Sequence, residues 1–150
     1  MIKEIKAPNG ITDEERSKNV VVFLAGSIEM GKAENWQKKV KRIYPLKDNV
    51  IFLNPRRDDW NSSWVQSVNN PQFRKQVEWE LRGMEIADKI ILYFDPVTKS
   101  PISLLELGLF AESDKLKVIC PDGFWRKGNV EIVCNRYEIP LFNSLEEALK

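Results

Sequence analysis

An uninterrupted apolar run near the start of the chain constrains the fold more than any other feature. Residues 20–25 read Val-Val-Val-Phe-Leu-Ala, with no polar side chain and several β-branched ones. A strand with one solvated face alternates apolar and polar residues, whereas an unbroken run is typical of a strand covered on both faces of a parallel sheet. Further short segments rich in apolar residues follow at residues 50–53, 89–94, 117–120 and 139–142. The sequence therefore predicts five short strands.

Segments with helical periodicity separate these strands. We expect helices over about residues 33–44 and 71–87, from residue 101 onward, over 124–134, and over 145–150 after the N-cap Ser144. Strands that alternate with helices indicate an α/β fold with a doubly wound five-stranded parallel sheet, a three-layer sandwich of the flavodoxin-like or Rossmann-like type. Residues 1–19 are polar and lack clear periodicity, so we interpret them as an N-terminal arm or edge extension and residues 20–150 as a single domain.

Composition narrows the chemistry. The 150 residues include no histidine, and the two cysteines, Cys120 and Cys134, are not in CxxC spacing. This excludes histidine-based acid–base catalysis, catalytic triads and most zinc sites, so we expect neither a metal nor another cofactor. With 23 basic and 22 acidic residues and a net charge of +1, the chain favours a small-molecule substrate over nucleic acid. We expect a cytoplasmic protein, because neither a signal peptide nor a membrane span is recognisable.

One carboxylate occupies an unusual place. Glu106 lies within residues 100–111, Ser-Pro-Ile-Ser-Leu-Leu-Glu-Leu-Gly-Leu-Phe-Ala, where Ser100 suits a helix N-cap and Pro101 the first helical position. Glu106 would then lie about one and a half turns into the helix. It could be a solvated residue on a polar stripe. Because leucines flank it on almost every side, we instead expect a helix buried on most sides and a desolvated, functional carboxylate.

Three loops should converge near this helix. Ligands of parallel α/β sheets bind beyond the carboxyl ends of the strands, where Gly26–Ser27, the segment 54–57 and the segment 95–100 all lie. Gly26 could admit a ligand close to the backbone and Ser27 could bind it, or the pair could be a simple turn; it matches neither the dinucleotide-binding fingerprint nor the P-loop.

Three carboxylates, those of Glu80, Asp95 and Glu106, belong to the same region. Two of them could lie in unlike environments, so that one is ionised and acts as a nucleophile while the other is protonated and acts as an acid. Glu80 could equally be a helix-surface charge, and Asp95 a turn residue before Pro96.

Several segments together resemble one enzyme family. They are Phe-Leu-Ala-Gly-Ser-Ile at 23–28, Asn-Pro-Arg-Arg-Asp-Asp-Trp at 54–60, Trp-Glu at 79–80, Ala-Asp at 87–88 and Leu-Glu-Leu-Gly at 105–108. Their order and spacing over about residues 20–142 resemble the nucleoside 2-deoxyribosyltransferase family, particularly its divergent "-like" branch. In that family a glutamate attacks the anomeric carbon of a deoxynucleoside, expels the base and forms a covalent deoxyribosyl-enzyme that a second base attacks.

The resemblance assigns roles residue by residue. It implies that Glu106 is the nucleophile, that Glu80 assists the leaving base where the family usually has Asp, and that the enzyme is a homo-oligomer with Asn129 near a neighbouring subunit's site. Trp60 could stack on the base or seal its loop, and Arg56 could clamp a phosphate or lie on the surface. The candidate substrate-binding residues are Gly26, Ser27, Asn54, Arg56, Asp58, Trp60, Ser100 and Asn129.

Other activities stay open. Well-studied transferases carry Asp where this chain has Ser100, and a related branch hydrolyses deoxynucleoside monophosphates with the same loop and Glu-Leu-Gly motif. The alternatives are therefore a nucleoside or nucleotide N-glycosidase with the same site and a non-catalytic nucleotide-binding module. Transfer and hydrolysis differ only in whether a base or water reaches the covalent intermediate.

Overall fold

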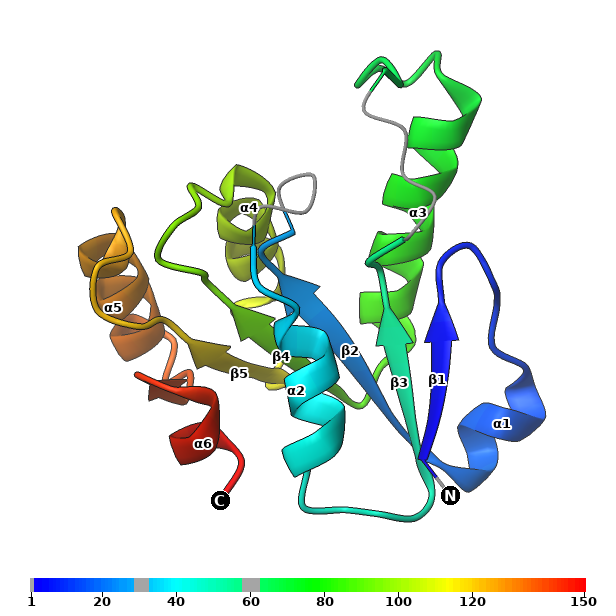
Figure 1. The fold of residues 1–150 in the computed structure, drawn as a ribbon, viewed down its shortest axis with the longest axis horizontal. Helices are drawn as coiled ribbons and strands as arrows, with labels where there is room; N and C mark the ends of the chain where they lie inside the picture. The colour runs from blue at the N-terminus through cyan, green and yellow to red at the C-terminus, as the bar shows by residue number, and fades with distance from the viewer. Residues whose placement is uncertain (1, 29–32, 58–62) are drawn as a thin grey trace.

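A single parallel sheet with helices on both faces forms the core of the computed structural model, which describes residues 2–28, 33–57 and 63–150 (Figure 1). Within these residues the sheet has six strands in the order β1-β3-β2-β4-β5-β6. The strands are β1 (Ile2–Lys6), β2 (Val20–Gly26), β3 (Val50–Asn54), β4 (Lys89–Tyr93), β5 (Leu116–Ile119) and β6 (Leu141–Phe142). The predicted three-layer α/β class is confirmed, and the predicted number of five strands is wrong.

The additional strand comes from the segment interpreted as an N-terminal arm or edge extension. β1 pairs in parallel with β3 at the sheet edge, and only Ile5 of its five residues is buried. An edge strand needs little apolar surface, so its sequence lacks the run that identifies the inner strands. Helix α1 (Asp13–Lys18) follows, with a capping box between Thr12 and Glu15, and it buries none of its residues.

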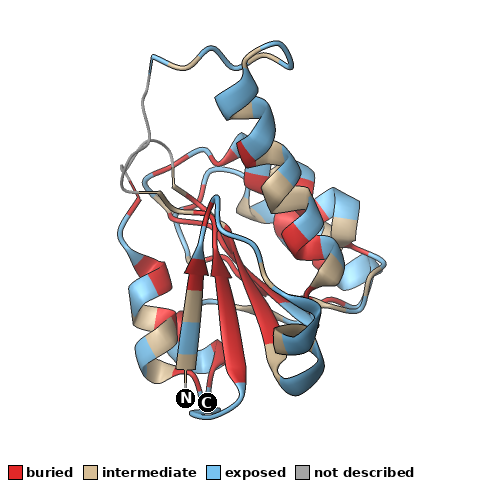
Figure 2. Ribbon diagram, turned by 90° about the vertical axis from the view of Figure 1, so that its right-hand side faces the viewer, coloured by how far each residue is buried: buried red, intermediate tan, exposed pale blue. Residues whose placement is uncertain are grey.

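The two faces of the sheet are covered by different helices. α3 (Pro71–Ile86), α4 (Pro101–Phe110) and α5 (Lys127–Arg136) pack on one face, while α2 (Trp36–Ile43) and α6 (Leu145–Ala148) pack on the other (Figure 1). Alternate residues of β2 divide between these layers: Phe23 belongs to the core cluster that contains Met84 of α3, and Leu24 to the cluster that contains Trp36 of α2. Figure 2 shows the inner strands almost wholly buried between the helices.

Helix ends differ from the sequence expectation where a cap decides them. α2 begins at Trp36 and not near residue 33, because the side chain of Asn35 accepts a hydrogen bond from the Lys38 amide. α5 begins at Lys127 and not at 124, since Phe124 is buried with its ring 4.9 Å from that of Phe94. Burying the Phe124 ring against Phe94 is favoured over extending α5 by another turn at its start.

A glycine brings α3 close to the sheet. A Cβ atom built on Gly83 would lie 2.6 Å from the Phe23 ring, so no larger residue fits without a shift of helix or ring. This contact fixes α3 above β2. Glu80, one turn before Gly83, is thereby held over the same part of the sheet.

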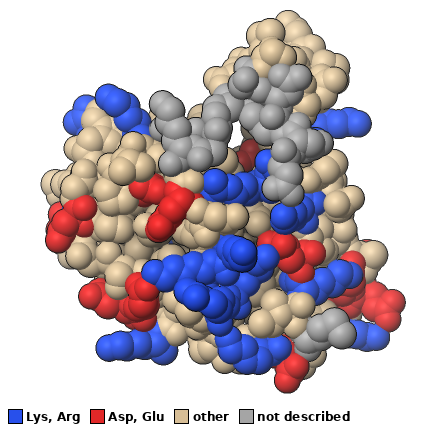
Figure 3. All heavy atoms as spheres, in the orientation of Figure 1, with Lys and Arg blue, Asp and Glu red and all other residues tan. Residues whose placement is uncertain are grey.

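Lysine and arginine side chains gather on the α2 face (Figure 3). Lys39 forms an ion pair with Glu146, and Lys41 pairs with Glu4 at 2.7 Å. This basic face lies across the sheet from α4 and Glu106. Among the described residues, no helix combines the length and apolar character needed to cross a lipid bilayer.

Candidate active site

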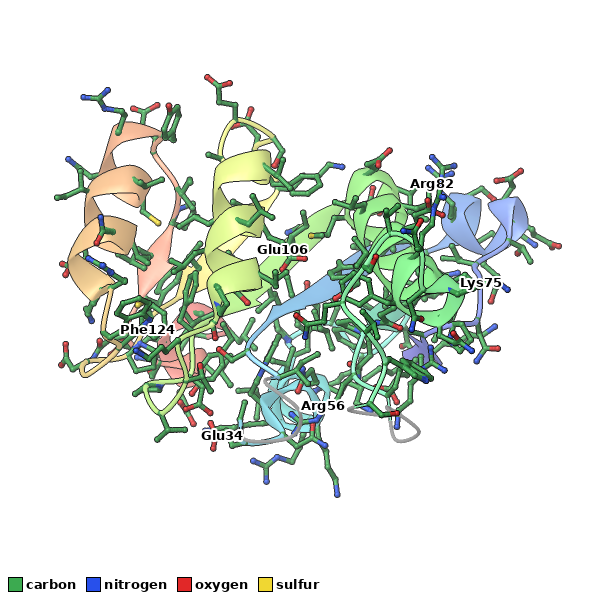
Figure 4. All side chains as sticks on the ribbon, turned by 90° about the horizontal axis from the view of Figure 1, so that it is seen from above. Glu34, Arg56, Lys75, Arg82, Glu106 and Phe124 are labelled. Atoms are coloured by element: carbon green, nitrogen blue, oxygen red, sulfur yellow. The ribbon has the colours of Figure 1, made fainter. Side chains whose placement is uncertain are left out.

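Glu106 points inward from a helix whose outer side is apolar. Its side chain faces the region between α4 and α3 (Figure 4), and the residue is only 7% exposed. By contrast, Ile102, Leu105 and Leu109 are 57–60% exposed. The expectation of a helix buried on most sides is therefore wrong: α4 buries only Ser103, Glu106 and Leu107. The buried side of the helix thus combines two polar residues with the core residue Leu107, and an aliphatic stripe lies outside.

Glu80 and Glu106 form an electrostatically linked pair across the two helices. Burial raises the pKa of Glu106 from 4.5 to about 7. Burial and, secondarily, the charge of Glu106 raise the pKa of Glu80 from 4.5 to about 8. In the part of the chain that the structure describes, no hydrogen bond or ion pair engages either carboxylate. Both carboxylates therefore bind their protons more tightly than an exposed glutamate does, so the pair can hold a proton near neutral pH.

Folding stability should fall as pH rises across this range. The folded protein keeps these protons up to about pH 7 and 8, whereas the unfolded chain releases them near 4.5. Between these values the folded state binds more protons, so unfolding becomes easier with rising pH, by an amount on the order of a few kcal/mol. Urea unfolding at pH 5 and pH 8 measures the change. The Glu80→Gln/Glu106→Gln double variant should lose most of this pH dependence, and an equal slope in that variant would rule out the pair as its source.

A cluster of buried hydroxyl groups fixes the start of α4. Ser100 is the N-cap residue in position, but its side chain does not cap the helix, and its backbone is left-handed, with φ 47° and ψ 55°. This conformation turns the hydroxyl toward Thr98 Oγ1, 2.7 Å away, and toward Ser27 Oγ. Thr98 also donates to Ser27 Oγ at 3.1 Å. The cluster ties the end of β2 to the helix that carries Glu106.

Gly26 is required by packing between strands. β2 and β4 pair Gly26 with Tyr93, and a Cβ atom at Gly26 would lie 2.3 Å from the Tyr93 carbonyl oxygen and 2.9 Å from the Trp36 ring. Its φ of 137° also favours glycine. The turn alone thus accounts for the glycine, and close approach of a ligand stays a prediction.

Asp95 holds neighbouring backbone segments together. Its Oδ2 accepts a hydrogen bond from the Glu34 amide at 3.0 Å, and its Oδ1 accepts one from the Val97 amide at 3.0 Å. Its own amide donates to Ser27 Oγ at 2.8 Å. The side chain therefore forms a turn after β4, and its role in chemistry stays a prediction.

Asn54 and Arg56 make similar internal contacts. The Asn54 amide group donates to Glu4 at 2.9 Å and accepts from the Arg56 backbone at 2.9 Å. The guanidinium of Arg56 donates to the carbonyl oxygens of residues 33 and 34, at 2.9 and 3.0 Å, and to Gln37 Oε1 at 3.2 Å. Arg56 thus lies beside Glu34 (Figure 4) and fastens the start of α2.

A family model described as nucleoside 2-deoxyribosyltransferase like matches residues 19–124. The chain belongs to the nucleoside 2-deoxyribosyltransferase-like family. The match spans β2 to the turn after β5 and includes both Glu80 and Glu106. Comparison with curated proteins gives no match.

Two of the predicted substrate-binding residues, Asp58 and Trp60, lie outside the described residues. Asn129 is exposed in the first turn of α5 and lies beyond the segment matched by the deoxyribosyltransferase-like model. Its predicted place near a neighbouring subunit's site stays a prediction.

Thr98 is not among the residues that the sequence predicted for the site. Its buried hydroxyl joins Ser27 and Ser100 and also lies 2.9 Å from the Asp95 carbonyl oxygen, a second acceptor within reach of its one proton. A threonine in a loop between two apolar segments carries no signal of its own, and only its position after β4 could have suggested it. Among the described residues of this family member, no group of three or more Cys, Asp and Glu residues is placed to hold a metal ion.

Proposed function

We propose that this protein cleaves the N-glycosidic bond of deoxynucleosides through a covalent glutamyl-deoxyribosyl intermediate and transfers the sugar to another nucleobase. The observation that carries the proposal is the pair formed by Glu106, which is buried, and Glu80, which is half-buried; neither has a compensating cation or hydrogen bond within the described residues. Burying acids without partners is costly, and membership of the deoxyribosyltransferase-like family supplies the corresponding chemistry.

In the first step a carboxylate oxygen of Glu106 bonds to the anomeric carbon. The bond from that carbon to the base nitrogen breaks, its electron pair stays with the base, and Glu80 supplies a proton to the departing base. In the second step the nitrogen of an incoming base attacks the same carbon and the Glu106 carboxylate leaves, while Glu80 recovers a proton. The raised pKa of Glu80 suits it to hold that proton at neutral pH.

The remaining candidates are proposed to position the substrate. Asp95 would orient the sugar or the acid through the loop that it stabilises, and Trp60 would stack on the base. Ser27, Asn54, Arg56 and Ser100 already hydrogen-bond within the protein. Any contact of these four with a substrate would therefore add to a preformed network and need little reorganisation.

Intact-mass analysis after incubation with a panel of deoxynucleosides tests the proposal. An added mass of one deoxyribosyl group, mapped by peptide analysis to Glu106, supports the covalent route. With a free acceptor base present, an exchanged nucleoside supports transfer. Free sugar and no exchange would replace transfer with hydrolysis, and nucleotide binding without any base release would show a non-catalytic module.

We further propose that the exposed face of α4 joins two copies of the chain. Ile102, Leu105 and Leu109 form an aliphatic stripe, and Gly108 beside them has open space around its Cα. Glu106 is the only charged residue of this helix and points inward. The exposed face of α4 therefore carries no charge that would favour a partner of opposite charge over a second copy of the chain. An uncharged aliphatic surface suits self-association of two helices about a two-fold axis.

Replacing Leu109 with lysine should convert the oligomer to monomers. The substitution places a charge on a 57% exposed residue of the apolar stripe, which a second copy would have to desolvate. Sedimentation equilibrium measures the mass. The matched control is Leu46→Lys, because Leu46 is 47% exposed and lies between α2 and β3. A monomeric wild-type protein, or an unchanged mass in the Leu109 variant, contradicts this interface.

A further inference from the structure

A groove runs between α3 and the β1–α1 segment, on the opposite side of α3 from Glu106. Two adjoining cavities of about 180 Å³ and 300 Å³ form it, and they share the lining residues Asp13, Arg16 and Ile86. Figure 4 shows Arg82 on the side of α3 that faces α1, whereas Glu106 lies on the other side. The groove is thus a separate feature from the carboxylate pair.

The floor of the groove is apolar and its wall aromatic. Leu53, Gly83 and Ile86 line it from below, and Trp79 stands beside them. The indole N–H of Trp79 already donates to the Asn9 carbonyl oxygen at 2.7 Å. Because its polar atom is satisfied, the part of the indole that lines the groove offers an apolar surface, to which a flat ring could pack.

Two guanidinium groups line the groove together with two carboxylates, Asp13 and Asp88, and the Asp88 carboxylate accepts a hydrogen bond from the Val21 amide at 2.8 Å. Arg82 lines the groove, and no hydrogen bond or ion pair engages it among the residues that the structure describes. Arg16 lines both cavities, and within the described residues its side chain pairs only with the fully exposed carboxylate of Asp13, at 3.9 Å, which is a weak surface pair. Paired arginines bind phosphate oxygens through planar, bidentate hydrogen bonds.

We propose that this groove binds a small organic phosphate monoester that carries a flat ring. The phosphate lies between Arg16 and Arg82, and the ring packs on Trp79 and the aliphatic floor. The cavity sizes suit a small molecule. Since α1 buries none of its own residues, it can shift toward the ligand at little cost in core packing. The proposal does not depend on the reaction assigned to Glu106.

The indole N–H resonance of Trp79 reports on this groove locally. We would titrate the ¹⁵N-labelled full chain, carrying Glu106→Gln to prevent turnover, with deoxyadenosine monophosphate, deoxyadenosine or inorganic phosphate, and assign the signal with Trp79→Phe. The monophosphate should shift the Trp79 signal saturably and bind at least about tenfold more tightly than either of the other probes. An unshifted Trp79 signal, or equal binding of the nucleoside or of inorganic phosphate, would overturn the proposal.

Substitutions test whether Arg16 and Arg82 themselves bind the phosphate, or whether the overall positive charge of the protein is enough. Arg16→Gln/Arg82→Gln should weaken binding of the monophosphate at least about tenfold, and Arg82→Lys should weaken it less, since a single ammonium retains charge without the bidentate geometry. Arg136→Gln on α5 removes one exposed charge far from the groove and should leave binding unchanged. Undiminished binding in the double variant refutes the phosphate site. Both arginines are solvent-facing, and circular dichroism checks the fold of each variant.

Discussion

Replacing Glu106 with glutamine should lower the rate of base release from a deoxynucleoside by about four orders of magnitude or more. Glutamine keeps the volume and the helical position but cannot form the glycosyl ester, so the covalent route is lost and not merely slowed. The measurement is chromatographic quantification of free base under single-turnover conditions. Glu112→Gln, an exposed glutamate just after α4, is the matched control and should retain activity.

The same variant should remain folded. Glu106 is 7% exposed and its pKa is raised by burial, so its ionised form is a cost to the folded state near neutral pH. Urea unfolding at pH 8 should show a stability no lower than that of the wild type. Base release at the wild-type rate in a folded Glu106→Gln protein would remove the nucleophile assignment.

Substituting Gly26 with alanine should destabilise the protein by about 3 kcal/mol or more. The new Cβ would lie 2.3 Å from the Tyr93 carbonyl oxygen, which belongs to β4 and cannot move without breaking its pairing with β2. The residue would also keep a φ of 137°, which residues with a Cβ rarely adopt. Backbone strain and steric overlap thus act together.

Urea denaturation followed by circular dichroism measures the loss of folding stability. If the loss is very large, the Gly26→Ala variant shows no cooperative unfolding transition at all. Gly128→Ala in α5 serves as the control, because nothing lies within 4 Å of its added Cβ and alanine favours a helix. That variant should be as stable as the wild type or slightly more stable. Comparable stability of the two variants would mean that the turn after β2 can relax in a way the structure does not show.

The inner strands were predictable because burial on both faces leaves a continuous apolar run, as in residues 20–25. β1 was not, since an edge strand with one buried residue resembles a polar arm. The direction in which α4 faces was also misjudged. Its abundance of leucine suggested burial on most sides, yet Leu105 and Leu109 are exposed while Glu106 is buried. Residue type alone does not say which side of a helix meets the sheet.

By itself the sequence determined the α/β class, most strand and helix positions, the family and the candidate carboxylates, because periodicity, unbroken apolar runs and short motifs are local properties of a chain. Only the tertiary structure decided that the pKa values of Glu80 and Glu106 are raised, that Ser27, Thr98 and Ser100 form one hydroxyl cluster, and that Arg16 and Arg82 share a groove. Desolvation and through-space charge depend on which distant segments the fold brings together, and no local pattern encodes those distances.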